Sequence, residues 1–333
     1  MNNSPVNNSV ISSDASIKAA FTSDIPVQVV AQWGEVTVYQ TSAFMAGLED
    51  NQNDTSELPS CKKMRLTECA SYGKLNLGLH VKDNAKQVLT HRMQLLSVIN
   101  QQLQAKQLSQ KNSIDKSFPI QSLYWVNQVH GKQIYDVDAS MFNMRALDAD
   151  AMISQQSGIG LAIMTADCVP IVLYQPATHQ IAAIHAGWQG LACGVIKATA
   201  ERFDINLPIM AWIGGCISQA HYEVGSEVAE KLLVGCTDNQ LLSAAKLSNF
   251  AELFCLATNV DSDHNGNKKL KIDLPKLAMA QLKSLNISIN NTLPIDCSYA
   301  DNHYYSYRRQ THLRQSATGR MALIIVRHDL VES

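Results

Sequence analysis

The middle of the chain holds a series of short apolar segments, and this series constrains the fold more than any other feature. Five of them have the length and residue types of β-strands: residues 122–129, 133–137, 161–165, 171–174 and 181–184. Pro170 separates the third from the fourth, and Pro176 ends the fourth, because proline cannot donate to a strand ladder. Residues 191–203 then change to a helical period. Strands and helices do not alternate strictly, so we predict an α/β fold with mixed sheets rather than a doubly wound one.

The flanking regions add further elements. Strands are predicted around Trp33-Gly34, at 210–213 and at 320–327. Helices are predicted over 84–105, 224–234 and 273–285. The first helix carries an apolar stripe of Leu89, Met93, Leu96, Ile99 and Leu103. Asp273 is expected to cap the last helix, with Pro275 in its first turn. Residues 1–25 are rich in Asn and Ser and predict a flexible tail.

Composition narrows the class of protein. The chain is 46% apolar and 17% charged, which is typical of a globular protein. Its net charge is -2 and no basic cluster is evident, so nucleic acid is not an expected partner. No apolar run approaches the roughly 18 residues of a membrane span, and the N-terminus does not resemble a signal peptide. We therefore expect a cytoplasmic protein whose eight cysteines are reduced.

Three residues at the ends of predicted strands stand out chemically. His130 follows 122–129, Cys168 follows 161–165, and His185 follows 181–184. Two imidazoles and one thiolate suit zinc or copper, and three protein ligands leave one coordination position open, as in catalytic sites. Each residue alone also fits a structural role, a histidine bound to a backbone carbonyl or a buried thiol. Spacing does not show that the three converge.

Other residues add candidate roles. Asp167 precedes Cys168 at the edge of an apolar run, where a charge needs a partner. We expect it to orient a ligand, with general base as the alternative. Arg308 and Arg309, among several tyrosines, suit anion binding and ring stacking, although a solvated surface loop is an equal alternative.

The motifs resemble, in order, the bacterial purine nucleoside phosphorylases of the polyphenol oxidase, or laccase-domain, family. The matching pieces are NLGLHVKD, NQVHG, DADAMI, TADCVPIVLY, IHAGWQGLACGVI, IGGCIS with YEVG, DLPKLAMAQL, and YYSYRRQ with TGRMALIIV. They lie within residues 72–327. The arginine and paired glycines that the family carries before NLG have no clear counterpart here, where a polar insertion separates 41–47 from 65–71.

The resemblance implies a single-domain α/β layered sandwich, here over residues 26–330, with mixed sheets flanked by helices. It implies a metal site on His130, Cys168 and His185, loaded with Zn2+ or alternatively Cu2+. Cys168, His185 and Asp167 are the implied catalytic residues, and Asn76, Arg308 and Arg309 the substrate-binding ones. The implied reaction is phosphorolysis of adenosine, inosine, guanosine or methylthioadenosine, with hydrolytic deamination of adenosine. The implied partners are purine nucleosides and phosphate, and the chain is a monomer or homodimer.

Three alternatives remain open from the sequence. Copper-dependent oxidation of phenols is one, but ten histidines include no His-x-His pair to build a multi-copper cluster. A metal-free hydrolase with Cys168 as nucleophile and His185 as base is another. The third is a binding protein that has kept the ligands but not the pocket.

Overall fold

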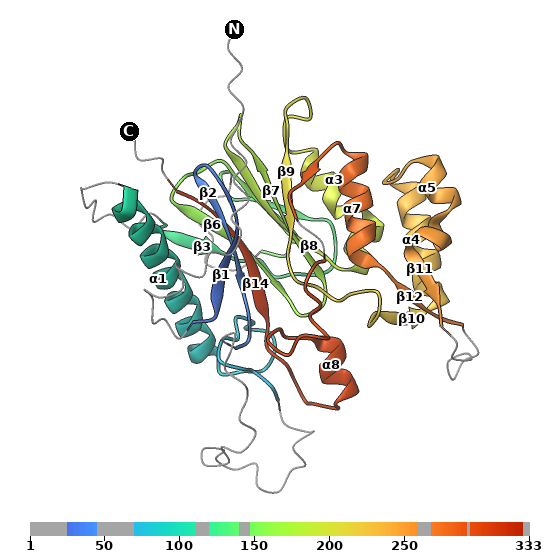
Figure 1. The fold of residues 1–333 in the computed structure, drawn as a ribbon, viewed down its shortest axis with the longest axis horizontal. Helices are drawn as coiled ribbons and strands as arrows, with labels where there is room; N and C mark the ends of the chain where they lie inside the picture. The colour runs from blue at the N-terminus through green and yellow to red at the C-terminus, as the bar shows by residue number, and fades with distance from the viewer. Residues whose placement is uncertain are drawn as a thin grey trace, which may run out of the picture.

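Two large mixed sheets form the centre of the molecule (Figure 1). The computed structural model describes residues 25–44, 70–110, 120–139, 147–258, 268–291 and 294–328, and of residues 107–110 the backbone alone. The first sheet has the order β1 (Val27–Trp33), β2 (Val36–Thr41), β14 (Met321–Arg327), β6 (Ile159–Thr165), β3 (Ser122–Tyr124). The second has the order β13 (Ser288–Ile289), β9 (Met210–Ile213), β7 (Val169–Gln175), β8 (Gln180–Ala186), β5 (Ala151–Ser154), β4 (Ile134–Asp136). Both combine parallel and antiparallel pairs, as the sequence predicts.

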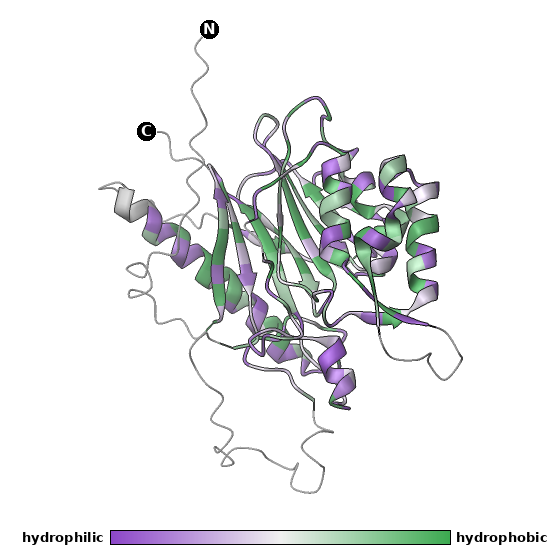
Figure 2. Cartoon of the chain, turned by 45° about the vertical axis from the view of Figure 1, so that its right-hand side comes forward, coloured by the Kyte–Doolittle hydropathy of each residue, from purple (hydrophilic) through white to green (hydrophobic). Residues whose placement is uncertain are grey.

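The strands are apolar on both faces because each large sheet is covered on both sides. Leu323 and Ile325 of β14 pack between the two sheets, whereas Ile324 and Val326 pack outward. Strand β7 shows the same alternation, with Val172 toward the first sheet. The strands therefore form the green centre of Figure 2. The chain thus folds as a mixed α/β structure with helices on the outer faces of the sheets.

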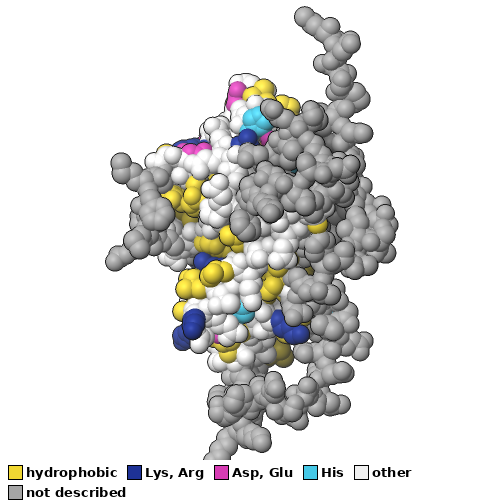
Figure 3. Space-filling model, turned by 90° about the vertical axis from the view of Figure 1, so that its left-hand side faces the viewer, with side chains coloured by type: hydrophobic (Ala, Val, Ile, Leu, Met, Phe, Trp, Pro, Cys, Tyr) yellow, Lys and Arg dark blue, Asp and Glu magenta, His cyan; other side chains and the backbone are white. Residues whose placement is uncertain are grey.

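The outer face of the first sheet is covered by α1 (Ala85–Gln110), which the sequence predicts. The predicted stripe is partly wrong. Leu89 and Met93 are 50% and 74% exposed, and the buried side of the helix is made by Val88, Leu95, Ile99 and Leu103. The buried side begins at Val88, whereas the predicted stripe begins one residue later, at Leu89. Apolar spacing alone does not distinguish these two helical faces. Figure 3 views this side of the molecule, where Lys and Arg side chains lie at separate points on the described surface.

Short helices cover the other outer face. They are α2 (Trp188–Cys193), α3 (Val195–Ala200), α4 (Ser226–Asp238), α5 (Ala244–Ser248), α6 (Phe250–Phe254) and α7 (Leu274–Ser284). The helix predicted over 191–203 is two helices, because Gly194 takes a positive φ of 83° and ends α2. The Asp273 cap of α7 is confirmed, since its side chain accepts from the Lys276 amide at 3.0 Å. None of the described helices is long and apolar enough to cross a membrane.

A small third sheet and one more helix complete the description. The sheet has the order β10 (Glu223–Gly225), β12 (Lys269–Ile272), β11 (Cys255–Ala257). Helix α8 (Tyr307–His312) follows near the C-terminus. The predicted tail and the polar insertion lie almost entirely outside the described residues, which begin at 25 and omit 45–69.

The strand predicted over 122–129 is wrong beyond residue 124. The Gln128 side chain occupies the edge of β6 instead, because its amide donates to the Met164 carbonyl at 2.8 Å and accepts from the Met164 N–H at 2.9 Å. The Gln128 side chain thus makes the hydrogen bonds to β6 that a further residue of strand backbone would have made. The chain turns two residues later at His130, whose φ is 62°. The strands predicted at 161–165 and 171–174 are confirmed, but they belong to different sheets. The connection between them, residues 166–168, crosses from one sheet to the other.

Candidate metal centre

The three chemically distinctive residues come together where the chain crosses between the sheets. His185 lies in β8 and pairs with Pro170 of β7, which places it close to Cys168, the residue before β7. His130 reaches the same point from its turn, with Nε2 3.9 Å from Cys168 Sγ and its ring edge-on to His185 at 4.7 Å between centroids. The three ligand atoms all lie within 4.8 Å of one another. His130 is exposed, Cys168 half-buried and His185 buried, so the cluster is open on one side.

Asp150 holds two of these residues in place, and sequence reasoning assigned it no role. Its fully buried carboxylate accepts from the amides of His130 at 2.9 Å and Gly131 at 2.6 Å. It also bonds His185 Nδ1 at 2.8 Å, which leaves Nε2 for a metal. Burial alone would raise the pKa of Asp150, but hydrogen bonds from His185 and these amides outweigh it and lower the pKa. An acid directly before the apolar 151–154 segment was the available signal.

The electrostatics favour a thiolate at Cys168. Burial would raise the pKa of this thiol, but the His185 imidazolium and hydrogen bonding from His130 and His185 lower it to about 6. Burial would lower the pKa of His185, whereas the Cys168 thiolate and Asp150 raise it to about 9. Without a metal the two side chains therefore form a thiolate–imidazolium pair at neutral pH. A metal binds the same thiolate form and displaces the imidazole proton.

Gly187 lies directly against the cluster, at a position where a side chain would crowd the donor atoms. A Cβ there would lie 3.1 Å from both Cys168 Sγ and His130 Cδ2. Glycine therefore lets the loop after β8 approach two of the donor atoms closely. Zinc binds such donors at roughly 2.0–2.3 Å, so a triangle of this size fits the ion after a small side-chain movement. The donor set and its support by Asp150 thus suit a metal with an open position.

The Asp167 side chain is bound to the C-terminal segment. The residue occupies the sheet crossing with a φ of 114°, an uncommon conformation for a residue other than glycine. Its buried carboxylate accepts from Ser298 Oγ at 2.7 Å and from the Arg308 amide at 2.7 Å. Burial raises the pKa of this carboxyl, against the opposing effect of these hydrogen bonds. Asp167 therefore fixes the C-terminal segment against the crossing from which Cys168 projects.

The three residues that the sequence assigns to substrate binding all make hydrogen bonds to other groups of the protein. The Arg309 guanidinium donates to the backbone carbonyls of Ser298 at 2.9 Å, Tyr299 at 2.7 Å and Asp301 at 3.2 Å, and to that of Tyr304. Asn76 is fully buried and accepts from the amides of Gly78 and Arg320, each at 2.9 Å. Arg308 lies over the Tyr222 ring and donates to the Glu223 carbonyl. Asn76 and Arg309 thus organise loops, whereas Arg308 contacts Glu223 and Tyr222 and its amide is bound to Asp167.

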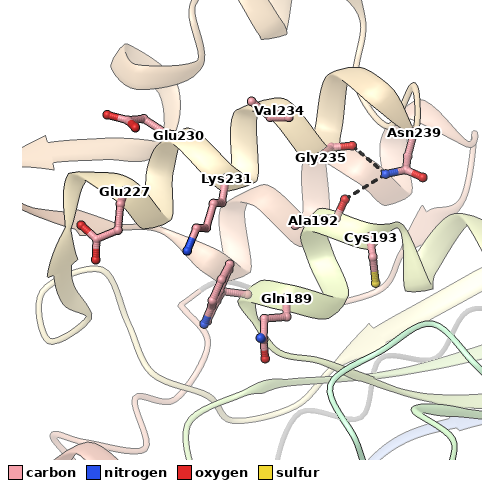
Figure 4. A pocket seen from close by; sticks show the side chains of 10 residues that line it. Gln189, Ala192, Cys193, Glu227, Glu230, Lys231, Val234, Gly235 and Asn239 are labelled. Carbon is pink, nitrogen blue, oxygen red and sulfur yellow. Dashed lines mark hydrogen bonds between the residues drawn. The ribbon is translucent and has the colours of Figure 1, made fainter.

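A surface pocket of about 550 Å³ lies apart from these residues, between α2 and α4 (Figure 4). Its lining consists of Trp188, Gln189, Ala192, Cys193, Glu227, Glu230, Lys231, Val234, Gly235 and Asn239. Cys193 is its one thiol, and burial raises the pKa of that group. The lining includes none of the three clustered residues, so we place the chemistry at the cluster and not in this pocket.

Comparison with known proteins identifies the chain's relatives. The family model described as multi-copper polyphenol oxidoreductase laccase matches residues 66–328. "Purine nucleoside phosphorylase YfiH" of Shigella flexneri is 32% identical over 257 residues, covering 76% of this chain and 86% of that protein. The protein of the same name in Escherichia coli strain K12 gives the same identity and coverage. A solved structure of a Neisseria meningitidis protein is 25% identical, with a TM-score of 0.61, and covers 92% of this chain and 100% of its own.

Proposed function

The chain belongs to the multi-copper polyphenol oxidoreductase laccase family, and on that basis we propose that it is a metal-dependent purine nucleoside phosphorylase. The relatives named above carry that activity in their names. The observation that carries the proposal is the donor triangle of His130, Cys168 and His185, supported by Asp150. We further propose adenosine, inosine, guanosine and methylthioadenosine as substrates, and deamination of adenosine as a second activity.

Some residues of the site would bind the metal directly, and others position the side chains that bind it. Nε2 of each histidine and the Cys168 thiolate would hold Zn2+, with Cu2+ as the alternative. Bound there, the metal supplies Lewis acidity and lowers the pKa of bound water. Asp150 keeps the His185 tautomer that leaves Nε2 unprotonated. Asp167 is proposed as a positioning residue, because it fixes the loop that presents Cys168.

A metal-free cysteine hydrolase is the second candidate, and one observation favours it. Cys168, His185 and Asp150 form the chain of nucleophile, base and orienting acid that such enzymes use. The depressed pKa of Cys168, about 6, fits a nucleophile as well as a ligand. Metal content of the purified protein separates the two proposals.

Copper-dependent phenol oxidation has less support. Four-electron reduction of oxygen normally uses several coppers, as the multi-copper name of the family implies. Within the described ranges of the chain, one group of three or more His, Cys, Asp or Glu side chains is close enough to hold an ion. Oxidation of a model phenol by copper-loaded protein is the test of this alternative.

The proposed function is tested by assaying adenosine with and without phosphate on protein whose metal content has been measured. Adenine with ribose 1-phosphate indicates phosphorolysis, and inosine indicates deamination. His185→Ala should lose both metal and turnover, while His179→Ala, at the opposite end of β8, should keep both. Undiminished phosphorolysis by metal-free His185→Ala protein would contradict the proposal.

A further inference from the structure

Arg320 stands next to the metal centre, and no role has been assigned to it. It directly precedes β14, whose Met321 pairs with Thr165, the last residue of β6. Because Cys168 follows Thr165 by three residues, the backbone of Arg320 lies beside the sheet crossing. Its charge interacts with Cys168, Asp167 and Tyr307.

The protein orients this guanidinium but leaves part of it free. Nη1 donates to the carbonyls of Thr318 at 3.1 Å and Gly319 at 3.0 Å. The Arg320 amide donates to Asn76, which fixes the backbone. Nε and Nη2 donate to no group among the described residues. The side chain is half-buried, so two N–H-bearing nitrogens lack an acceptor from the described part of the chain, beside a partly enclosed site.

A second basic group comes from the turn that packs on Arg320. A Cβ at Gly78 would lie 2.8 Å from Arg320 Cγ, which shows how closely this turn contacts the arginine. Two residues later, the exposed His80 interacts electrostatically with Arg320, and with His130 and His185 across the site. Partial desolvation, followed by these positive neighbours, lowers the pKa of His80. His80 is therefore a second basic group close enough to interact with both Arg320 and the clustered histidines.

Two other arginines of this region, Arg92 and Arg309, have two nitrogens engaged in hydrogen bonds. Arg309 is bound by backbone carbonyls. Arg92 donates from two nitrogens to the Leu77 carbonyl and stacks over Trp125 at 4.1 Å. Arg308 donates to the Glu223 carbonyl and faces Tyr222. Among the described residues, Arg308 and Arg320 each donate through Nη1 alone, which leaves Nε and Nη2 for a bidentate contact with an oxyanion. We choose Arg320 because its charge interacts with Cys168.

We propose that Arg320, together with His80, binds a phosphate dianion beside the Cys168–His185 pair. This inference rests on the proposed phosphorylase function, for which it supplies the anion site. It proposes Arg320 in place of Arg308 and Arg309, the two arginines that the sequence offers for anion binding. The same chemistry fits inorganic phosphate or the phosphoryl group of a nucleoside monophosphate, and the experiment distinguishes these sources.

The test measures the Kd of inorganic phosphate, and separately of adenosine 5′-monophosphate, for zinc-loaded protein by isothermal titration calorimetry. Arg320→Gln should raise the phosphate Kd about tenfold or more, because bonds to a charged group are lost. Arg320→Lys should restore part of the affinity, because it keeps the charge but not the fork. His80→Gln, at an exposed position, should raise the Kd by a smaller factor without affecting folding. Arg202→Gln, which removes an exposed arginine paired with Asp136, is the matched control and should leave the Kd unchanged.

The outcomes separate this inference from the proposed function. An unchanged Kd for both phosphate and adenosine 5′-monophosphate in Arg320→Gln and His80→Gln, or a rise confined to Arg308→Gln, overturns the site. Loss of monophosphate binding alone would assign the site to a nucleotide rather than to free phosphate. Phosphate binding that depends on Arg320, in a protein without phosphorolysis, would support the site and refute the phosphorylase. A raised phosphate KM with unchanged adenosine KM in Arg320→Gln supports both.

Discussion

Asp150→Asn should weaken zinc binding more than any other change outside the three ligands. The carboxylate accepts four hydrogen bonds, from the amides of Val129, His130 and Gly131 and from His185 Nδ1. Asparagine has one accepting oxygen and one donating nitrogen. If its oxygen accepts from the His130 amide and His185, its N–H2 group faces the amides of Val129 and Gly131, which lie 3.3 and 2.6 Å from the carboxylate in the native protein. If the amide is turned, His185 loses its acceptor instead.

Either orientation leaves a donor without a partner in a fully buried place, which costs about 1–3 kcal/mol of stability. Loss of an outer-shell partner of a metal-bound histidine lowers metal affinity by roughly 10–100-fold. Competition with a colorimetric zinc chelator measures the affinity, and urea unfolding of the metal-free protein measures the stability. Asp148→Asn is the control. Asp148 lies two residues before Asp150 in the sequence, is exposed, and accepts a hydrogen bond from Asn127. Native zinc affinity in Asp150→Asn would refute the argument that this carboxylate supports the centre.

Three further predictions follow from the same geometry. In metal-free protein, iodoacetamide should modify Cys168 at a rate that rises through about pH 6, because the thiolate is the reactive form, and His185→Ala should move this rise to higher pH. Gly187→Ala should fold normally yet bind zinc roughly tenfold more weakly, because its Cβ would displace two donors, and the chelator assay measures this. Asp167→Asn should lower the free energy of unfolding by about 1–3 kcal/mol in urea while zinc stoichiometry stays at the native value; loss of zinc would instead show that Asp167 supports the metal directly.

The sequence predicts the elements of the fold better than their arrangement. Strands such as β7 and β8 are continuous apolar runs, and their type follows from local pattern. The assignment of β6 and β7 to different sheets does not, because each strand is apolar on both faces in either sheet. The one-residue error in the phase of α1 has the same origin, since apolar residues occur on more than one side of that helix.

The chemical type of the site can likewise be predicted from the sequence, but the arrangement of its residues cannot. The residue types of His130, Cys168 and His185 predict a soft-metal centre, but their convergence depends on the register between β7 and β8. The roles of the arginines depend on which carbonyls their loops present. Arg309 is enclosed by carbonyls of residues 298–304, whereas Arg320 is held from one side. Tandem arginines beside tyrosines look alike in sequence whether they bind a ligand or their own loop.

The crossing between the sheets explains why the thiolate lies where it does. A chain that leaves β6 and enters β7 must change sheets within residues 166–168, and Asp167 makes that turn at a φ of 114°. Such a conformation costs about 1–3 kcal/mol and persists only when its surroundings stabilise it. The Asp167 carbonyl accepts from the Ile217 amide, and its carboxylate accepts from Ser298 and Arg308, so three distant segments supply that stabilisation. The same contacts that maintain the turn therefore hold Cys168 at the open edge between the sheets, within reach of His185 on the neighbouring strand and of His130 from its own turn.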